Sequence, residues 1–519
     1  MRVPLPLVLV FALAGCSADY SLGGDDGPYD QSDTADNGAS EDPDDGAPPE
    51  QENAFLAMRP AQTDVFVFVA NPSRNTVTRV NVNTLEVRTT EVGLDPHGIV
   101  TTPDNTTCVV FNRGDDSVSI IDADTLEQRV VPVRDDFNKL VMSPNGRWVA
   151  LFHDVAAERP DDPPPSGVQS YNEVSFVDLV TGEHFGMAVD YQPREIQFTP
   201  NGLLAAVVTK TSLGIVDLNA RPLLPHLVPL TDVLVDPPSA EEVVVVPDGS
   251  YAFVRQFGAQ DIVVVDLATE VTTHVPVGEN PTDIDLTPDN THAVVVSRGS
   301  HELHLFDVAA PFDPPQILGL PPDVSLGSVL IDPTGRQAIV YTTASLTDRY
   351  ATWDLTTDAI TLRQLVKPIR EISITPDGNS LLVFHTKSDA ESADPASPFH
   401  NSWAMTLISL DDQRQNPLRL PAEPIGFANS ADGAYGYFIM AGVHQLTRLD
   451  YLTLLPEEFP VKSDPVYVGV LPDLDLTDGD QPKAWVSQEH PLGRMSFYDA
   501  DDNSLETITG FELNSAIEE

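Results

Sequence analysis

The sequence predicts an all-β fold, a propeller of ten four-stranded antiparallel blades. One phrase recurs ten times in the 519 residues: a Pro, two variable residues, two apolar residues with a spacer between them, and then Ser/Thr-Pro-Asp/Asn-Gly/Asn. Its anchors follow at intervals of 41 to 47 residues, with two longer intervals of 56 and 55, and are Pro60, Pro103, Pro144, Pro200, Pro247, Pro288, Pro333, Pro376, Ala431 and Pro472. Self-similarity at this period is typical of propellers and solenoids.

The repeat around Pro288 illustrates how one unit is expected to fold. Its expected strands are 284–287, 292–297, 302–308 and 316–320. Their β-branched residues and short alternation favour strands over helices. Pro288-Asp289-Asn290 forms the first turn, since Pro presets φ and Asn accepts the remaining turn dihedrals. Four such strands make one blade of a propeller.

An Asp closes the third strand of most units, and a Thr or Ser often follows within three residues. These aspartates are Asp122, Asp178, Asp217, Asp266, Asp307, Asp354, Asp450 and Asp499. Because they recur from blade to blade, we interpret them as caps of the turn into the fourth strand and not as catalytic groups.

No linker separates consecutive units, which favours one large ring, with two smaller rings as the alternative. Ten blades exceed the usual four to eight. We expect residues 510–517 to pair beside residues 54–58 and to hide a strand edge.

Residues 55–519 resemble the YVTN family of β-propellers, which includes lactonase-like proteins. The resemblance depends on phrases such as Val246-Pro247-Asp248-Gly249 and the run 262–269 (IVVVDLAT). It implies the propeller fold but no single activity, because propellers of this kind serve as enzymes, electron-transfer scaffolds and binding modules.

The amino terminus predicts a bacterial lipoprotein. Residues 1–15 have the features of a signal peptide, and Leu13-Ala14-Gly15-Cys16 resembles a lipobox, which implies acylation of Cys16. The alternative is an ordinary signal peptide with a chance Cys. Residues 16–54 are acidic, without Lys, Arg or His, and are expected to form a disordered tether. Ser17 resembles an outer-membrane sorting residue, so the expected location is the cell envelope, with the lipid as the only contact with the membrane.

The chain is strongly acidic, with 79 Asp and Glu against 28 Lys and Arg and a net charge of −51. Such a surface repels nucleic acid and anionic headgroups, and we interpret it mainly as a determinant of solubility. Cys108, the only cysteine after Cys16, lies in a strand-like run and is expected to be a small buried apolar residue.

The two long intervals are insertions between the second and third strands of units three and eight, at 153–172 and 387–401. Units three and eight lie opposite each other in a ring of ten. In an antiparallel blade these loops share a face with the start of every first strand. We therefore expect this face to carry the function.

Polar residues at the starts of the first strands are the candidate ligand-binding residues of the channel mouth: His97, Lys139, Arg194, Glu195, Asp283, Arg370 and Glu371. Arg194 and Arg370 would act as fork-type donors to an anionic or polar ligand. The alternative is that each Arg forms a structural pair with a neighbouring Glu. His97 has no histidine at the equivalent position of other units, which argues against a transition-metal site.

The acidic run near the end of the chain is the candidate calcium site, with Asp473, Asp475, Asp478 and Asp480 as ligands and Gly479 in the turn. The alternative is a solvated acidic turn, and no other cofactor is expected.

The expected function is that of a non-enzymatic binding or scaffold module for an envelope protein, a glycan or a small anionic ligand. No nucleophile, P-loop or dinucleotide motif occurs in the required context. The alternative is a lactonase-like hydrolase at the channel mouth, with Glu195, Glu371, Asp283 or His97 as acid or base.

Overall fold

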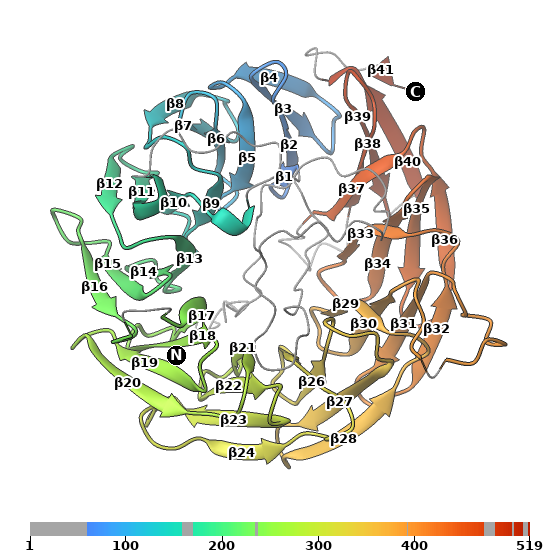
Figure 1. The fold of residues 1–519 in the computed structure, drawn as a ribbon. Coiled ribbons are helices and arrows are strands. Elements are labelled where there is room, and N and C mark those ends of the chain that lie inside the picture. The colour runs from blue at the N-terminus through green and yellow to red at the C-terminus, as the bar shows by residue number, and fades with distance from the viewer. Residues whose placement is uncertain are drawn as a thin grey trace, which may run out of the picture.

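Ten antiparallel sheets follow one another around a ring, nine of four strands and the last of four with a short fifth strand added at the rim (Figure 1). The computed structural model describes residues 60–157, 170–233, 237–391, 393–471, 483–500, 503–511 and 517–518. In every sheet the strands are ordered as in the sequence, with the first strand innermost and the fourth on the rim. The predicted all-β propeller of ten four-stranded blades is confirmed.

The strands of blades 1 to 5 are β1 (Ala61–Gln62), β2 (Phe66–Asn71), β3 (Thr76–Asn81), β4 (Val87–Glu91), β5 (Pro96–Thr101), β6 (Thr107–Asn112), β7 (Ser117–Asp122), β8 (Gln128–Pro132), β9 (Lys139–Met142), β10 (Trp148–Phe152), β11 (Glu173–Asp178), β12 (His184–Ala188), β13 (Pro193–Phe198), β14 (Leu204–Thr209), β15 (Ser212–Asp217), β16 (Pro225–Pro229), β17 (Ser239–Val245), β18 (Tyr251–Phe257), β19 (Asp261–Asp266) and β20 (Val271–Pro276). Those of blades 6 to 10 are β21 (Pro281–Leu286), β22 (His292–Ser297), β23 (Glu302–Asp307), β24 (Gln316–Gly319), β25 (Ser328–Ile331), β26 (Gln337–Tyr341), β27 (Arg349–Asp354), β28 (Ala359–Gln364), β29 (Ile369–Ile374), β30 (Ser380–His385), β31 (Ala404–Ser409), β32 (Gln415–Arg419), β33 (Pro424–Asn429), β34 (Tyr435–Met440), β35 (Val443–Asp450), β36 (Pro456–Pro460), β37 (Pro465–Val470), β38 (Lys483–Gln488), β39 (Arg494–Asp499), β40 (Ser504–Thr509) and β41 (Ile517–Glu518). Two short 3-10 helices, η1 (Val155–Ala157) and η2 (Ser170–Asn172), lie in the insertion of blade 3.

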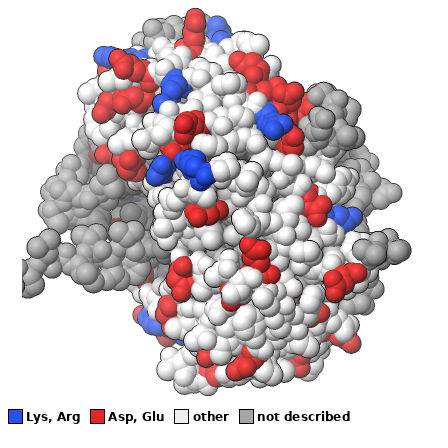
Figure 2. All heavy atoms as spheres, turned by 90° about the vertical axis from the view of Figure 1, so that its left-hand side faces the viewer, with Lys and Arg blue, Asp and Glu red and all other residues white. Residues whose placement is uncertain are grey.

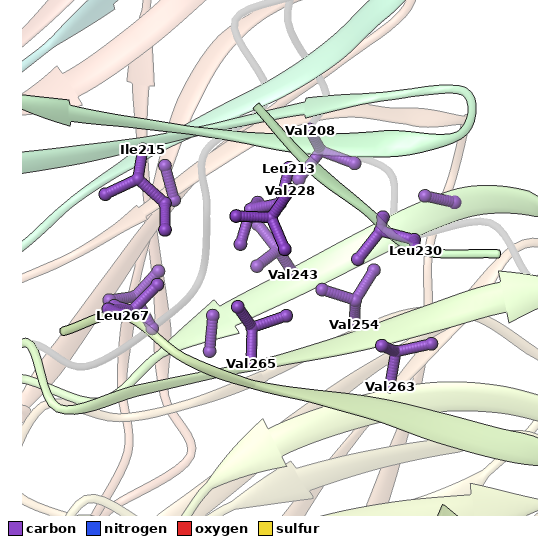
Figure 3. Close-up of a cluster of buried hydrophobic side chains, with 14 residues drawn as sticks. Val208, Leu213, Ile215, Val228, Leu230, Val243, Val254, Val263, Val265 and Leu267 are labelled. Atoms are coloured by element: carbon purple, nitrogen blue, oxygen red, sulfur yellow. The ribbon is translucent and has the colours of Figure 1, made fainter. Parts of the chain in front are cut away.

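Apolar side chains fill each boundary between neighbouring blades. Between blades 4 and 5, for example, Val208 and Leu213 face Val243 and Val254 (Figure 3). Ten such clusters occur, one for each boundary of the ring, and the last joins blade 10 to blade 1. The chain therefore forms one ring, and the alternative of two smaller rings is wrong.

The repeated phrase folds as a turn that is closed by side-chain hydrogen bonds. The Ser or Thr hydroxyl donates to the Asp or Asn two residues on, as from Thr287 to Asp289 at 2.7 Å. The last position of the phrase has positive φ, which Gly and Asn tolerate best, as at Asn290 (57°) and Gly378 (69°). The first anchor is an exception, since the turn of blade 1 lies at Thr63–Val65 and not at Pro60.

All eight predicted aspartates end the third strand of their blades. In seven of them the carboxylate accepts backbone N–H groups of the following turn, as Asp122 does from Asp124 and Thr125. These hydrogen bonds lower the pKa of Asp122 below its ordinary value. The capping role is confirmed.

The carboxyl terminus covers the outer edge of blade 10. β41 pairs with β40 on the rim of that blade, through Ile508 with Glu518 and Thr509 with Ile517. Residues 54–58, beside which the carboxyl terminus was expected to pair, lie outside the described residues. Exposed rim edges invite pairing with other chains, and Pro residues protect several of them, as in β16, β20 and β36. The last blade uses a short extra strand instead.

Within the described residues, no helix has the length and apolar character needed to cross a bilayer. Residues 1–54, which include the expected signal peptide, Cys16 and tether, lie outside the described residues, and so do Asp473, Asp475, Asp478 and Asp480. Cys108 is fully buried in β6, and burial raises the pKa of its thiol, as expected for an inert apolar residue.

Candidate functional site at the channel mouth

We call the side of the ring with the second-to-third strand loops and the starts of the first strands the insertion face. The insertions of blades 3 and 8 both lie between the second and third strands, as predicted, joining β10 to β11 and β30 to β31. The opposite side, the turn face, carries the first-to-second and third-to-fourth turns. This division places every candidate residue of the channel mouth on the insertion face.

First strands of seven blades contain a β-bulge near their start. The register shifts lie between Pro96 and Gly98, Pro193 and Glu195, Ala240 and Glu242, Pro281 and Asp283, Ile369 and Glu371, Pro424 and Gly426, and Pro465 and Tyr467. A bulge adds a residue to one strand and redirects its side chains. His97, Arg194 and Arg370 occupy the extra position, so three of the seven candidate residues coincide with these bulges.

Arg194 and Arg370 form ion pairs across blade boundaries. Nη1 of Arg194 lies 2.6 Å from Oε1 of Glu241, and Nη2 of Arg370 lies 2.9 Å from Oε1 of Glu423. The guanidinium of Arg370 also stacks on Trp403, 5.3 Å from the ring centre. Both arginines remain about one-third exposed (32% and 28%), so they can still meet a solute, but each already has a carboxylate partner.

The carboxylates of Glu195 and Asp283 bind backbone groups of the next blade. Glu195 accepts the N–H of Val243 at 3.1 Å, and Asp283 accepts that of Val329 at 2.6 Å. The innermost strand of a blade has one edge without a partner strand, and these side chains satisfy its donors. Glu371, half-buried in β29, lies opposite Phe384 of β30. Glu195 and Asp283 thus have a structural task that would compete with acid–base work.

Two further arginines lie on this face, Arg255 partly buried and Arg298 fully buried. Nε of Arg255 donates to Glu242 at 2.9 Å. Burial would lower the pKa of Arg255, but Glu242, Glu241 and Asp283 raise it above its ordinary value. Arg298 is 1% exposed. His97 is also buried, and no group of three or more His, Cys, Asp or Glu side chains placed to hold a metal occurs within the described residues.

Blade 3 holds its insertion with a buried ion pair. The ammonium of Lys139 lies 3.0 Å from Oδ2 of Asp154, and both side chains are under 10% exposed. Asn138 and Asp154 exchange two hydrogen bonds, from Asn138 Nδ2 to the Asp154 carbonyl (2.9 Å) and from the Asp154 N–H to Asn138 Oδ1 (2.7 Å). Next to this pair, Nδ1 of His153 lies 2.8 Å from the carbonyl of Asp136. Lys139 is therefore committed to fixing the base of the loop.

Blade 8 repeats this arrangement on the other side of the ring. Lys367, 1% exposed, bonds to the carboxylate of Asp389 and donates to the carbonyl of Lys387 at 3.0 Å. The other oxygen of Asp389 lies 2.7 Å from Nδ1 of His400 and accepts the N–H of Asn401 at 2.8 Å. Partial burial would raise the pKa of Asp389, but its bonds to Lys367 and Asn401 lower it. One carboxylate thereby ties both ends of this loop to the blade.

His385 lies beside this ion pair and is fully buried. Its Nδ1 is 3.2 Å from the carbonyl of Pro368 and its Nε2 is 2.7 Å from Oγ1 of Thr406. Since a carbonyl only accepts, Nδ1 carries the proton and Nε2 accepts from the hydroxyl. Burial lowers the pKa of His385 to about 4, so the ring is neutral in the folded protein at neutral pH.

We expect His385 to make the folded protein less stable as the pH falls from about 6.5 to about 4. The unfolded chain binds a proton in this range and the folded chain does not, which costs about 3 kcal/mol at the lower end. His385→Gln should therefore show a shallower loss of stability over this window, measured by urea unfolding at several pH values.

The sequence did not lead us to predict that both insertions are held by similar Lys–Asp ion pairs. One signal was present: the second strand runs into Phe152-His153 in blade 3 and Phe384-His385 in blade 8, the two blades with insertions. Scarcity of lysine was another, since two of the few lysines hold these loops. The partner aspartates lie at different distances along the chain, so no fixed spacing identified them.

Comparisons with known proteins support the fold. No protein-family model matches the sequence, and no curated protein matches it. Among solved structures, a eukaryotic initiation factor matches with a TM-score of 0.51 at 10% identity, covering 77% of this chain and 97% of that one. The dihydro-heme d1 dehydrogenase NirN in complex with DHE matches at 0.44 and 15% identity (78% and 73% covered), and apo AztD from Citrobacter koseri at 0.36 and 14% (61% and 86%). The match to the initiation factor, the one of these three with a TM-score above 0.5, indicates a shared fold and no particular activity.

Proposed function

We propose that this protein is a non-enzymatic binding or scaffold module of the bacterial cell envelope, anchored through lipid on Cys16. Its recognition surface is the insertion face, and its partner is an envelope protein or a glycan. The resemblance to YVTN propellers is compatible with this role, because rigid rings of this kind present broad surfaces.

The observation that carries the proposal is the matched anchoring of the two insertions. Each loop starts from a buried Lys–Asp pair beside a buried histidine, in blades that lie on opposite sides of the ring. Buried ion pairs of this kind are costly to form and contribute more to a defined arrangement than to stability. We infer that the arrangement fixes where the two loops leave their blades, for a partner that contacts both.

Charge favours recognition by hydrogen bonds and steric fit over the capture of anions. Figure 2 shows the ring from its rim, where acidic side chains are spread over the surface with fewer basic ones among them. Arg194 and Arg370 already share carboxylates across blade boundaries. A lactonase-like hydrolase would need a carboxylate or imidazole free to transfer protons, and Glu195 and Asp283 instead accept backbone N–H groups.

A loop-replacement experiment tests this function. Residues 158–169 and 390–399 are replaced, singly and together, by short Gly-Ser linkers in the full-length protein, and solubilised envelope proteins and a glycan array are screened for binding. We expect binding in the wild type, loss of more than tenfold in affinity with either replacement, and no further loss with both. The wild type should sediment with membranes, and Cys16→Ala should release it.

The matched control changes the turn face instead. Leu452, 89% exposed in the third-to-fourth turn of blade 9, is replaced in Leu452→Ser, which should bind as the wild type does. Binding that survives removal of both loops would overturn the proposal. Lactone or ester hydrolysis by the wild type that is lost in Glu195→Gln would support the hydrolase instead.

A further inference from the structure

A polar cavity of about 350 Å3 lies on the turn face, at the boundary between blades 7 and 8. One wall is formed by β27 and β28 of blade 7, and the other by the turn Leu410–Gln413 of blade 8. Arg336 and Gln337, which follow the first turn of blade 7, form its inner end. The cavity is on the side of the ring opposite the insertions, so it is independent of the function proposed above.

The inner end of the cavity is held rigidly by bonds between the two blades. Arg336 donates from Nη1 to Asp411 at 3.1 Å, from Nη2 to the carbonyl of Gly378 at 3.0 Å and from Nε to Thr334 at 2.8 Å. Gln337 donates to the carbonyl of Leu410 at 2.8 Å. Side chains fixed in this way need little reordering when a ligand binds, which favours affinity.

Arg363 has unused hydrogen-bonding capacity in the cavity. This residue, half-buried in β28, bonds only through Nε, to Thr352 at 3.2 Å, which leaves its two terminal nitrogens without a partner among the described residues. Gln413 donates from Nε2 to Gln337 at 2.9 Å and to Leu410 at 3.1 Å, and its Oε1 is fully buried, so this amide belongs to the rigid wall and is closed to a ligand.

The charges of the lining select against ions. Arg336 and Arg363 are balanced by Asp354 and Asp411, in a protein whose net charge is −51. An anion would meet the two carboxylates and a cation the two guanidinium groups, and the polar walls offer little to an apolar ligand. The complementary ligand is neutral and can both donate, to the carboxylates of Asp354 and Asp411, and accept, from Arg363.

We propose that this cavity binds a neutral, hydroxyl-rich ligand, namely a monosaccharide or the terminal sugar of a glycan. A hydroxyl group donates one hydrogen bond and accepts others, so neighbouring hydroxyls of a sugar can accept from Arg363 and donate to Asp354 or Asp411 together. The volume lies at the lower end of ligand sites, which run from about 300 to 1,000 Å3, and therefore suits a small ligand.

Titration with small probes tests the assignment. Glucose, galactose, mannose, N-acetylglucosamine and myo-inositol are titrated against the full-length protein by saturation-transfer NMR and calorimetry, with phosphate and citrate as anionic probes. We expect at least one neutral probe to bind and the anions not to bind. Arg363→Gln should weaken that binding at least tenfold, since a hydrogen bond from a charged donor is lost.

Two further variants make the outcome decisive. Thr361→Val, at an exposed residue lining the cavity, removes one hydroxyl with little change of shape and should weaken binding severalfold, even if Arg363→Gln folds poorly. Arg88→Gln, at an exposed arginine on the rim strand of blade 1, is the matched control and should bind normally. Three results would each overturn the proposal: no neutral probe binds, only the anions bind, or Arg363→Gln and Thr361→Val both bind a neutral probe as tightly as the wild type does.

Discussion

Trp485→Ala is expected to lower the free energy of unfolding by about 3–5 kcal/mol and to loosen the ring at its closure. Trp485 is 1% exposed at the boundary of blades 10 and 1, where it packs with Val67, Val80 and Phe497. Its indole N–H donates to Gln62, whose amide in turn donates to the carbonyl of Val470 at 2.6 Å. The substitution removes the largest side chain of this cluster and a hydrogen bond between the two ends of the chain.

Closure is special because the chain does not run across it. Among the described strands, blade 1 contains only residues 61–91 and blade 10 only residues from 465 onward, so no strand is exchanged between them. Every other boundary is also crossed by the polypeptide. Loss of side-chain packing here should therefore separate the two terminal blades, since units of a repeat protein are held by their neighbours alone.

Urea unfolding and hydrogen exchange together measure this effect. Trp353→Ala is the matched control, because Trp353 is equally buried (1% exposed) at the boundary of blades 6 and 7. Both variants should lose similar free energy, but only Trp485→Ala should speed exchange in β1–β4 and β37–β40. Unchanged exchange in these strands would show that packing at the closure is not what holds the ring shut.

Much of the fold could be predicted from the sequence because each repeat folds from one continuous stretch of the chain. Each blade is built from consecutive strands, so the turn phrase, the alternation and the closing Asp locate its parts without knowledge of distant contacts. The anchor at Pro60 was wrong because blade 1 has a shortened first turn, at residues 63–65. This error falls at an end of the repeat array, where the pattern has no neighbour to confirm it.

The candidate site was located but its contacts were not predictable. The variable residues after the first Pro do lie at the starts of the innermost strands, but the bulges there turn Arg194 toward Glu241 of the next blade. That pairing depends on how two sheets pack, which local pattern does not encode. The cavity of blades 7 and 8 was missed for the same reason, since Arg336, Arg363 and Gln413 come from three separate segments.

The second prediction with a large effect on stability concerns the ion pair of Lys367 and Asp389. Asp389→Ala should lower the free energy of unfolding by about 3–5 kcal/mol, because it leaves the ammonium of Lys367 buried at 1% exposure without its carboxylate. It also removes the acceptor that holds His400 and the N–H of Asn401, so the loop of blade 8 should lose its fixed shape. Circular dichroism during urea unfolding measures the first effect, and proteolysis within residues 386–403 the second.

A double-mutant cycle separates the two contributions. Lys367→Met in the Asp389→Ala background replaces the unpaired charge with an apolar side chain of similar length, and most of the lost stability should return. The loop should nevertheless remain open to protease, since His400 and Asn401 still lack their acceptor. If the double variant were as unstable as Asp389→Ala, the cost would lie in the loop and not in the stranded charge. If instead it regained both stability and protease resistance, Asp389 would not organise the loop, and the insertion face would have to be held by other contacts.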